Sequence, residues 1–391
     1  MRLGSDCRVI VAPQTLDCMK QSALTKKSVV HLVEGFNRIG GPPRLVRLLI
    51  SSELNQEFEF HVVTYSAKWW EICAWSKVYF ALLRLKATIV HVHGLKADGF
   101  FATFLCRLAF VPNILLTVHG SVADAINQYT TNTAKLSQLI VAKLLEPMTL
   151  LMADAVYCVC DAMHNQKRIQ RYARKRLFPT IHNGVEHKSP VASVCVTRSS
   201  LGFTKLDVIV VYTGRVTRDK GIFDLIEAFC RLHEAEVRQN SRLTKLIIVG
   251  DGENLQEARD LLKVHISRRV VVLTGCRTDA EQITQCSDIF LLPSLHENAS
   301  FSLLEAMSAG CAVIASAVGG NVELIEDGKS GVLVPPSNPT ALMNAMWRLV
   351  QNPDHRKVLG YNAQQRALTQ FTAKLVIRRT RCMYKAIVNA G

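Results

Sequence analysis

The sequence has 391 residues, of which 49% are hydrophobic and 20% charged, and its formal net charge at pH 7 is +15. This length and composition are typical of a globular protein with two domains, and they exclude a disordered chain or a small disulfide scaffold. The 12 cysteines form no paired Cys-x-x-Cys motifs, no apolar run reaches membrane-spanning length, and no nucleic-acid-binding motif accompanies the basic charge.

In the first half of the chain, apolar segments that predict strands alternate with segments that predict helices. This pattern predicts an α/β protein in which parallel strands are joined by helices. Residues 1–27 have no adequate apolar core for a secretory signal and are expected to form a poorly specified extension. The strands predicted after this extension are Ser28–Val33, Phe60–Thr64, Thr88–His93, Ile114–His119, Ala155–Val159 and Phe178–His182.

Two glycines follow the first predicted strand. Gly40 and Gly41 precede a Pro-Pro pair, so a tight turn is expected to lead into a helix that tolerates proline in its first turn. Backbone N–H groups at a helix start attract anions. A phosphate site and a simple structural turn are both consistent with this arrangement.

Three histidines, His91, His93 and His119, lie at or near the carboxyl ends of predicted strands. Open α/β sheets bind ligands at these ends. The His91-Val-His93 pair could hold a metal, but no Asp, Glu or Cys partner lies nearby, so this interpretation is not favoured. His119, which is followed by glycine, is the better candidate for direct contact with a substrate.

A linker is expected over residues 186–204, and the alternation of strands and helices then resumes. The strands predicted in the second half are Asp207–Tyr212, Lys245–Val249, Val270–Leu273, Asp288–Leu292, Ala312–Ala315 and Gly331–Val334. A helical tail is expected from about Pro339.

A basic turn follows the first strand of the second half. Gly214 and Arg215 begin this turn, and Lys220 ends it close to a helix start. Arginine offers a planar fork for phosphate oxygens and lysine a point charge, and the helix dipole adds to both. A diphosphate clamp is predicted here, with a solvated basic loop as the alternative.

The most informative segment follows the strand Asp288–Leu292. Glu297 lies in the loop, and the next helix is predicted to begin near Phe301 with Ser300 as its N-cap. Glu305 lies about one turn inside this helix, so both carboxylates can face one cleft. Two carboxylates and unpaired backbone N–H groups suit a polyhydroxylated, phosphate-bearing ligand, although an ordinary strand–loop–helix with solvated acids fits equally well.

Together these residues resemble retaining glycosyltransferases of family 4, whose GT-B architecture has two Rossmann-like parallel-sheet domains facing each other across a cleft. The resemblance covers nearly the whole chain from residue 28. Its strongest motifs are Gly214-Arg215…Lys220-Gly221, Gly250-Asp-Gly-Glu253, Pro293…Glu297…Leu304-Glu-Ala-Met307, Val318-Gly-Gly-Asn-Val-Glu323 and Asp327-Gly-Lys-Ser-Gly-Val-Leu-Val-Pro335. The weaker ones are Gly40-Gly41, His91-Val-His-Gly94, Thr117-Val-His-Gly120, Ala153-Asp-Ala155 and His182-Asn-Gly-Val185.

The resemblance implies roles for the matching positions. Arg215 and Lys220 would bind the donor diphosphate and stabilise it as a leaving group. Glu305 would hold the ribose hydroxyls, and Glu297 would contact the transferred sugar near its reacting carbon. His119 would lie by the donor sugar and the acceptor. The other donor-binding positions that the resemblance implies are Gly40, Gly41, Gly214, Phe301, Ser302 and Leu303.

The resemblance also implies a reaction course. Family members retain the anomeric configuration by front-face attack, with the leaving phosphate taking the proton of the acceptor. The sequence has no Asp-x-Asp motif, so neither a divalent metal nor another cofactor is expected, and protein cations replace magnesium. Asn298-Ala-Ser300 stands where glycines are usual in the family, so the transferred sugar is not inferred from the resemblance.

The expected domains are the 1–27 extension, an acceptor-side domain over residues 28–195, a nucleotide-sugar-binding domain over residues 196–375, and a helix over residues 376–391 that packs back on the first domain. The expected function is transfer of a sugar from a UDP- or GDP-type donor to a glycan or polyprenyl-linked acceptor, in cell-surface polysaccharide or lipopolysaccharide biosynthesis. The alternatives are a GT-B nucleotide-sugar epimerase, which needs no acceptor, and a non-catalytic nucleotide-sugar-binding scaffold.

A cytoplasmic location is expected, with peripheral binding at the inner face of the plasma membrane. The segment Lys68–Trp75 contains three tryptophans that could meet lipid headgroups or the acceptor, and the basic run Gln166–Arg176 could touch anionic lipid. For each segment, a packed or solvated helix face is the alternative.

Overall fold

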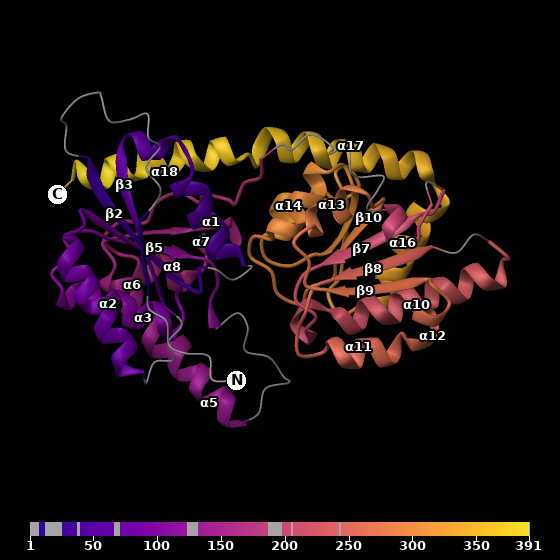
Figure 1. Cartoon of the computed structure of the whole chain (residues 1–391), viewed down its shortest axis with the longest axis horizontal. Coiled ribbons are helices and arrows are strands. Elements are labelled where there is room, and N and C mark those ends of the chain that lie inside the picture. Colours follow the sequence, from indigo (N-terminus) through magenta and orange to yellow (C-terminus); the bar gives the residue numbers. More distant parts are fainter. Residues whose placement is uncertain are drawn as a thin grey trace. The chain divides into compact units, whose positions relative to one another are not determined.

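The computed structural model describes residues 8–11, 26–36, 40–65, 71–122, 132–186, 198–204, 206–241 and 244–390. The chain divides into two compact units (Figure 1). The N-terminal unit comprises residues 1–182 and 374–391, and the C-terminal unit comprises residues 183–373. Within the described ranges, no helix is both long and apolar enough to cross a membrane.

The N-terminal unit is built around a six-stranded sheet of order β1-β3-β2-β4-β5-β6. Its strands are β1 (Arg8–Val11), β2 (Lys27–Glu34), β3 (Phe58–Tyr65), β4 (Ile89–His93), β5 (Ile114–Val118) and β6 (Ala155–Cys158). Its helices are α1 (Gly41–Ile50), η2 (Glu53–Gln56), α2 (Ile72–Leu85), α3 (Ala97–Leu108), α5 (Asn132–Ile140), η3 (Val141–Leu145), α6 (Glu146–Met152), α7 (Asp161–His164), α8 (Lys167–Tyr172) and α18 (Ala373–Val388).

All strand pairs in this sheet are parallel except β1 with β3. Parallel strands have both faces covered by helices, which explains why β4 and β5 are buried along their whole length. The chain adds β3 on one side of β2 and β4 on the other, so the strand order reverses between β2 and β4. Ligands bind at such a switch point in open α/β sheets.

The C-terminal unit contains a second six-stranded sheet, of order β12-β11-β10-β7-β8-β9, with every pair parallel. Its strands are β7 (Ile209–Thr213), β8 (Lys245–Val249), β9 (Val271–Gly275), β10 (Ile289–Leu292), β11 (Ala312–Ser316) and β12 (Val332–Val334). Its helices are η4 (Arg218–Lys220), α10 (Ile222–Arg238), α11 (Leu255–Leu261), α12 (Lys263–Ser267), α13 (Ala280–Gln285), α14 (Phe301–Ser308), α15 (Asn321–Leu324), α16 (Pro339–Gln351) and α17 (Pro353–Gln370).

The switch point of the second sheet lies between β7 and β10, which are neighbours although they are far apart in sequence. The loop after β7 carries the basic turn, and the loop after β10 carries Glu297. The strand order therefore brings the two most informative segments of the sequence to one edge of one sheet.

The prediction of a strand at Phe178–His182 is wrong. This segment runs beside β6 and donates two backbone hydrogen bonds to it, from Phe178 N and Ile181 N. The donor nitrogens are three residues apart while their acceptors, the carbonyl oxygens of Val156 and Cys158, are two apart, so the regular spacing of a parallel ladder is lost in this segment. Only the neighbouring Leu177 forms an isolated bridge, to Val156.

Two further features were not expected. The extension over residues 1–27 contains the strand β1, which pairs antiparallel with β3 at the sheet edge. The second unit starts at Asn183, ahead of the predicted boundary at residue 195. Val185 exchanges backbone hydrogen bonds with Phe371 and Ala373, which ties this segment to the C-terminal unit.

Helix α18 packs on the N-terminal unit, beside β2 and β3 (Figure 1). Its Tyr384 is fully buried, with its ring centre 5.3 Å from that of Phe58 in an edge-to-face arrangement. Lys385 forms an ion pair of 2.7 Å with Glu57, and Arg381 pairs with both acids of the η2 region. The helix is thus held by the buried contacts of Tyr384 and a surrounding set of ion pairs.

Candidate active site

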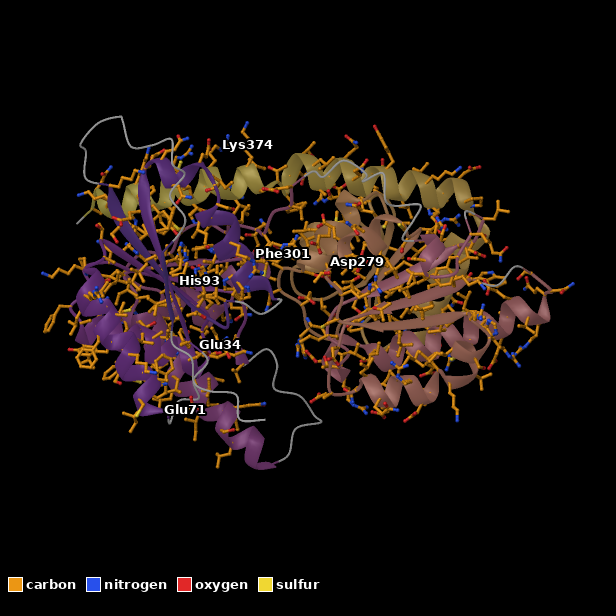
Figure 2. All side chains as sticks on the ribbon, viewed as in Figure 1. Glu34, Glu71, His93, Asp279, Phe301 and Lys374 are labelled. Atoms are coloured by element: carbon orange, nitrogen blue, oxygen red, sulfur yellow. The ribbon has the colours of Figure 1, made fainter. Side chains whose placement is uncertain are left out.

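The helix after the β10 loop begins where the sequence predicted. Helix α14 starts at Phe301, and the side chain of Ser300 accepts a hydrogen bond from Leu303 N at 3.2 Å, which confirms the predicted N-cap. The Leu303 amide is therefore already engaged by the cap. Glu305 lies about one turn into α14 and is half-buried. Phe301, labelled in Figure 2, is mostly buried at the helix start.

Glu297 and Lys220 form an ion pair. Lys220 Nζ lies 2.7 Å from Glu297 Oε2, and the two side chains are only 18% and 14% exposed. Ser294 adds a longer hydrogen bond of 3.3 Å to the same carboxylate oxygen. Removing only one member of an ion pair that is largely shielded from water destabilises a protein, because the remaining charge is left buried without a partner.

Arg215 has a different partner from Lys220. Its guanidinium Nη2 lies 2.9 Å from Asp219 Oδ2, and its side chain is 64% exposed. Partial burial acts to raise the pKa of Asp219, but the hydrogen bond from Thr217 and the charges of Arg215 and Lys220 outweigh it, so the pKa is lowered. The predicted clamp thus consists of an exposed Arg–Asp pair and a buried Lys–Glu pair.

A buried tyrosine fixes the backbone of the turn that carries Arg215. Tyr212 Oη donates a hydrogen bond of 2.5 Å to the carbonyl oxygen of Arg215. A Cβ atom on Gly214 would lie only 3.0 Å from that hydroxyl oxygen. Gly214 therefore lets the backbone of the turn lie directly over Tyr212.

Two glycines allow the loops around the ion pair to approach each other closely. Gly221 has φ +70°, and a Cβ atom there would lie 1.9 Å from the carbonyl oxygen of Pro293. Gly319 has φ +47°, and its Cβ would lie 1.7 Å from the carbonyl oxygen of Glu297. No side chain fits at such distances, so glycine is required at both positions by space as well as by conformation.

We expect Gly221→Ala to disrupt the site far more than Gly328→Ala. The two glycines have nearly the same φ, +70° and +71°, but no described residue lies within 4 Å of a Cβ at Gly328. Gly328→Ala should cost about 1–2 kcal/mol of unfolding free energy for its left-handed backbone alone. Gly221→Ala must also displace Pro293, so it should cost more and remove nucleotide binding. Thermal unfolding and calorimetry measure both; equal losses in the two variants would contradict the steric argument.

Three contacts that the sequence did not predict brace the β10 loop. Asn183 donates a side-chain hydrogen bond of 2.8 Å to the carbonyl oxygen of Ala299. Leu295 N donates to the carbonyl oxygen of Asp219 at 2.9 Å, which joins the β10 loop to the basic turn. Gly320 N donates to the carbonyl oxygen of Glu297 at 3.2 Å. Of the three donor residues, Asn183 and Gly320 belong to motifs noted in the sequence, but which residues accept their hydrogen bonds depends on the fold.

The glycines of the first half lie at the start of α1. Gly40 is the N-cap residue, no side chain caps the helix, and prolines occupy its first turn as predicted. Gly40 has an extended backbone with φ 179°, and among the described residues a Cβ there would meet nothing closer than 3.8 Å. Other residues can adopt this backbone conformation at position 40. Glycine would therefore be required there only by the close approach of a ligand.

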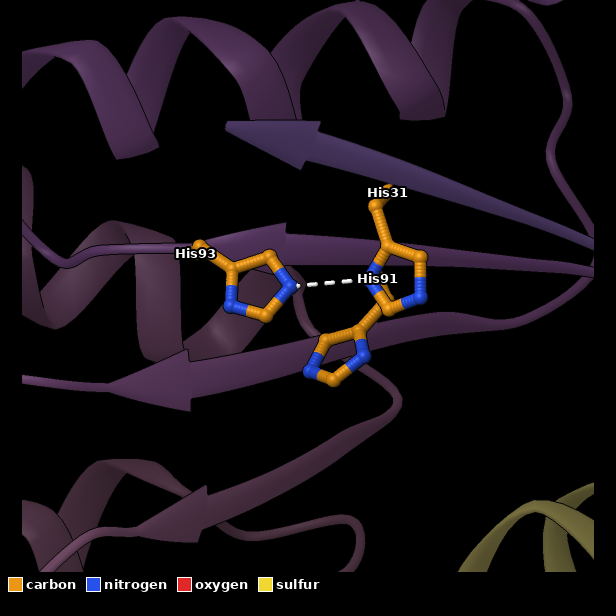
Figure 3. Close-up of side chains that lie close together, drawn as sticks. All are labelled: His31, His91 and His93. Carbon is orange, nitrogen blue, oxygen red and sulfur yellow. Dashed lines mark hydrogen bonds between the residues drawn. The ribbon is translucent and has the colours of Figure 1, made fainter. Parts of the chain in front are cut away.

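His91 and His93 lie on β4, and the structure adds His31 from β2 as a third buried histidine (Figure 3). One ring nitrogen of each lies within 4.8 Å of the others, a grouping that could hold a metal ion. Both nitrogens of His91 already bond to the protein, Nδ1 to Tyr384 at 2.8 Å and Nε2 to Thr117 at 2.5 Å. A metal ion would have to displace these bonds, so the geometry favours hydrogen bonding over metal binding.

The sequence did not indicate that His31 belongs with this group. Its Nδ1 lies 2.9 Å from His93 Nε2, and His93 Nδ1 lies 3.2 Å from His119 Nε2. His119 is half-buried just past the end of β5. The only signal for His31 in the sequence was its place inside an apolar strand next to the strand that carries His91 and His93.

Several comparisons identify what the chain is similar to. Residues 26–189 match the model Glycosyltransferase Family 4, and residues 196–366 match the model Glycosyl transferases group 1. The chain belongs to glycosyltransferase family 4. It is 27% identical over 283 residues, 70% of this chain and 69% of the relative, to the UDP-Gal:alpha-D-GlcNAc-diphosphoundecaprenol alpha-1,3-galactosyltransferase of Escherichia coli.

Solved structures establish the fold of this family 4 glycosyltransferase. Sucrose-phosphate synthase from Thermosynechococcus elongatus gives a TM-score of 0.78 at 20% identity, covering 94% of this chain and 100% of that one. HepE from Anabaena, solved with UDP and glucose, gives 0.72 at 17% identity, covering 92% and 100%. The two parallel-sheet units are therefore those of the GT-B fold. The comparisons favour a sugar transferase over the epimerase and scaffold alternatives.

The buried histidines should make this glycosyltransferase less stable in mild acid. Burial lowers the pKa of His31 to about 3, and it lowers the pKa of His91 and of His93 well below the usual value. The unfolded chain, with a histidine pKa of about 6.5, then binds more protons than the folded one. The stabilisation is complete above that pH and is lost progressively as the pH falls toward about 3.

His31→Leu provides the test of this pH dependence. At pH 5.5 we expect the burial of neutral His31 to cost the wild type about 1.4 kcal/mol relative to pH 7.5. Unfolding of the variant should lack this part of the pH dependence. Calorimetric unfolding at the two pH values measures the difference, and an equal pH dependence in both proteins would show that His31 is not the source.

Proposed function

We propose that this enzyme is a retaining, metal-independent glycosyltransferase that transfers a sugar from a UDP-sugar to a lipid-linked or glycan acceptor. The observation that carries the proposal is the Lys220–Glu297 ion pair at the switch point of the C-terminal sheet, next to the start of α14. The pair brings a cation and a carboxylate to one edge of the sheet, where ligands bind, and in the proposal the cation serves a diphosphate and the carboxylate a sugar.

The donor diphosphate is proposed to bind Lys220 and Arg215. Breaking the bond between the sugar and the phosphate builds negative charge on the leaving diphosphate, and a fixed cation stabilises charge where it develops. In the structure Lys220 is neutralised by Glu297, at 2.7 Å. A diphosphate would therefore compete with the carboxylate for this lysine, which leaves Glu297 able to turn toward the positive character at the sugar.

The remaining donor contacts are proposed from the family resemblance. Glu305 would hold the ribose hydroxyls, and the amides of Phe301 and Ser302 would contact the donor sugar. Leu303 was expected to join them, but its amide already donates to Ser300 Oγ at 3.2 Å. We therefore propose that Leu303 contributes through the packing of its side chain at the helix start. Gly40 and Gly41 would approach the phosphates through the open start of α1.

The reaction proposed at this site needs no metal. The acceptor oxygen forms the new bond to the anomeric carbon on the face from which the phosphate oxygen departs, and that phosphate oxygen takes the acceptor proton. Lys220 and Arg215 supply the positive charge that a metal would otherwise provide. The test is transfer in excess EDTA with NMR analysis of the product: undiminished rates and a retained anomeric configuration support the proposal, whereas loss of activity or inversion would refute it.

UDP is proposed as the nucleotide, with GDP as the alternative. The name of the Escherichia coli relative gives UDP-Gal as donor and a diphosphoundecaprenol-linked acceptor, and HepE was solved with UDP and glucose. A screen of radiolabelled UDP- and GDP-sugars against an undecaprenyl-diphosphate-linked sugar tests both choices. Incorporation from a UDP-sugar alone supports the proposal, and incorporation only from a GDP-sugar would overturn the choice of base.

The structure changes which residues are proposed to face a membrane. Trp75 is only 6% exposed and packs against Tyr65 and Phe101, so it cannot meet lipid, while the other two tryptophans of its segment lie outside the described residues. In the predicted basic run, Arg168 pairs with buried Glu146. That run is therefore partly structural.

An exposed apolar surface on the N-terminal unit is a better membrane site. It lies on the helices α2, α3, α5, η3 and α6, which contact one another in series, and on the turn after α3. The large apolar side chains of this surface that are exposed are Ile72, Phe80, Leu83, Phe104, Leu108, Phe110, Leu136, Leu139, Ile140, Leu144, Met148 and Leu151. An exposed apolar area of this kind marks an interaction site.

The charges around this surface favour an anionic lipid bilayer as the partner. Lys77, Arg84 and Lys86 are exposed on or at the end of α2, and the sequence contains no acidic residue between Glu71 and Asp98. Apolar side chains next to cations suit the boundary between acyl chains and anionic headgroups. The enzyme would thus work where a lipid-linked acceptor is held.

Flotation with phosphatidylglycerol-containing vesicles tests the membrane proposal. Phe80→Asp with Phe104→Asp should abolish flotation, because each change places a charge in the contact surface. Val358→Asp, at an exposed apolar position of the C-terminal unit, is the matched control and should float like the wild type. A wild type that does not float, or a double variant that floats normally, would refute this surface.

A further inference from the structure

Three histidines form a continuous hydrogen-bonded chain that ends at His119. His31 Nδ1 meets His93 Nε2 at 2.9 Å, and His93 Nδ1 meets His119 Nε2 at 3.2 Å (Figure 3 shows the first bond). We call this series, from β2 through β4 to the end of β5, the imidazole chain. His31 and His93 have exposed fractions of 0% and 3%, whereas His119 is half-buried. The imidazole chain therefore leads from the core to the residue that the sequence predicts to contact the substrate.

The rings of the imidazole chain are neutral at neutral pH. Burial lowers the pKa of His31 and of His119 to about 3, and it lowers the pKa of His93 well below its usual value, with the neighbouring histidines adding to the effect. A neutral imidazole has one N–H donor and one acceptor nitrogen. Each bond in the chain thus has a direction, and both bonds must run the same way because His93 takes part in both.

The two directions differ at the buried end. His31 Nε2 is buried and has no hydrogen-bond partner among the described residues. If the bonds run from His119 to His31, this atom is an unpaired N–H group; if they run from His31 to His119, it is an unpaired acceptor. Among buried backbone groups, N–H donors without a partner are rarer than under-satisfied acceptors, and we apply the same order to this ring nitrogen. The direction from His31 to His119 is therefore favoured.

We propose that His31 and His93 are positioning residues that hold His119 neutral, with its proton on Nδ1 and its Nε2 engaged by His93. In this state His119 acts toward the substrate as a hydrogen-bond donor, and it cannot serve as a general base because neither ring nitrogen offers a lone pair to a hydroxyl proton. The proposal rests on the proposed transferase function and on the substrate contact that the family resemblance implies for His119. It explains why a half-buried histidine at this position is tied to two fully buried ones.

The loop after His119 is fixed by a second buried network. Glu146 is fully buried and accepts hydrogen bonds from Val122 N at 2.6 Å and from Ser121 Oγ at 2.8 Å. Arg168 Nη1 lies 2.5 Å from the same carboxylate and balances its charge. His119 is thus held by its ring on one side and by the following backbone on the other, as the positioning of a substrate-binding group requires.

The first test reads the tautomer directly in the full-length protein. Two-bond 15N–1H spectra of histidine-labelled enzyme distinguish protonated from unprotonated ring nitrogens, and the signals missing in His119→Gln assign His119. We expect a protonated Nδ1 and an unprotonated Nε2. A proton on Nε2, or averaging between the two tautomers, would overturn the proposal. This measurement needs no activity and no variant of His31 or His93 that might fail to fold.

The second test measures the effect on transfer. His93→Leu should lower kcat about 10- to 100-fold, the size of effect seen when the hydrogen-bond partner of a metal-ligating histidine is removed, with the Kd for UDP unchanged. His93→Asn, whose amide can still donate to His119, should recover part of the loss. His61→Leu, on β3 of the same sheet but outside the imidazole chain, is the control and should keep normal kcat.

The outcomes separate this inference from the proposed function. Normal kcat in His93→Leu, with a wild type that transfers sugar, would refute the positioning role and leave the transferase assignment intact. A wild type that transfers to no acceptor would refute the proposed function, while the spectrum would still decide the tautomer of His119.

Discussion

Glu297→Ala should lower kcat about 100- to 1,000-fold while leaving the affinity for UDP within a few-fold of the wild type. An electrostatic group that acts only in the transition state has an effect of this size when it is removed. The carboxylate is proposed to act at the sugar, where positive character develops. Its present partner is Lys220, at 2.7 Å, so its removal frees that lysine for the diphosphate and does not weaken the phosphate site.

Glu297→Gln is the matched control for this prediction. Glutamine keeps the size of the side chain and an oxygen that can accept a hydrogen bond from Lys220, but it lacks the charge. If the charge matters, kcat should fall nearly as far as in the alanine variant; if the hydrogen bond suffices, kcat should be largely restored. Steady-state kinetics and UDP calorimetry measure both quantities. Normal turnover in Glu297→Ala would overturn the assignment of this residue.

Lys220→Ala should weaken UDP binding at least about tenfold, lower kcat as well, and destabilise the C-terminal unit. Of the two cations proposed to bind the diphosphate, Lys220 has less access to water, because its side chain is 18% exposed and that of Arg215 is 64% exposed. Charge-assisted hydrogen bonds to phosphate are among the stronger ones in proteins. The destabilisation follows because Glu297 is left largely buried without its partner, which should cost about 2 kcal/mol of unfolding free energy.

The double variant Lys220→Ala/Glu297→Ala separates the two effects. Removing both charges removes the unpaired carboxylate, so stability should recover, whereas UDP binding should stay weak because no cation has been restored. Arg215→Ala is a useful comparison, since its guanidinium is 64% exposed and should lose less binding than Lys220→Ala. A double variant that is no more stable than Lys220→Ala would show that the ion pair carries little energy.

The elements around the site could be predicted because their signals are local. Ser300 before an apolar helical segment predicts both the start of α14 and its cap, and the structure shows both. Strands such as Lys245–Val249 follow from continuous apolar runs bounded by turn residues. The predicted strand at Phe178–His182 failed because the segment loses regular hydrogen-bond spacing with β6 after Phe178, which the apolar pattern does not reveal.

The contacts within the site could not be predicted because they depend on strand order. Lys220 and Glu297 are 77 positions apart, and they meet only because β10 lies next to β7. The sequence indicated that both residues bind a ligand but not that they bind each other. Likewise, His31 joins His93 only because β2 and β4 are neighbours, and Trp75 is buried because α2 turns that face toward the sheet.

The measurement that tests this account most directly is calorimetric titration of UDP into the wild type and Lys220→Ala, both in excess EDTA, with GDP and ADP as comparison ligands. The account predicts that the wild type binds UDP without metal and in preference to the other two nucleotides, and that Lys220→Ala loses most of this affinity. UDP binding that requires a divalent metal, or that is unchanged in Lys220→Ala, would contradict the claim that this protein cation holds the donor diphosphate.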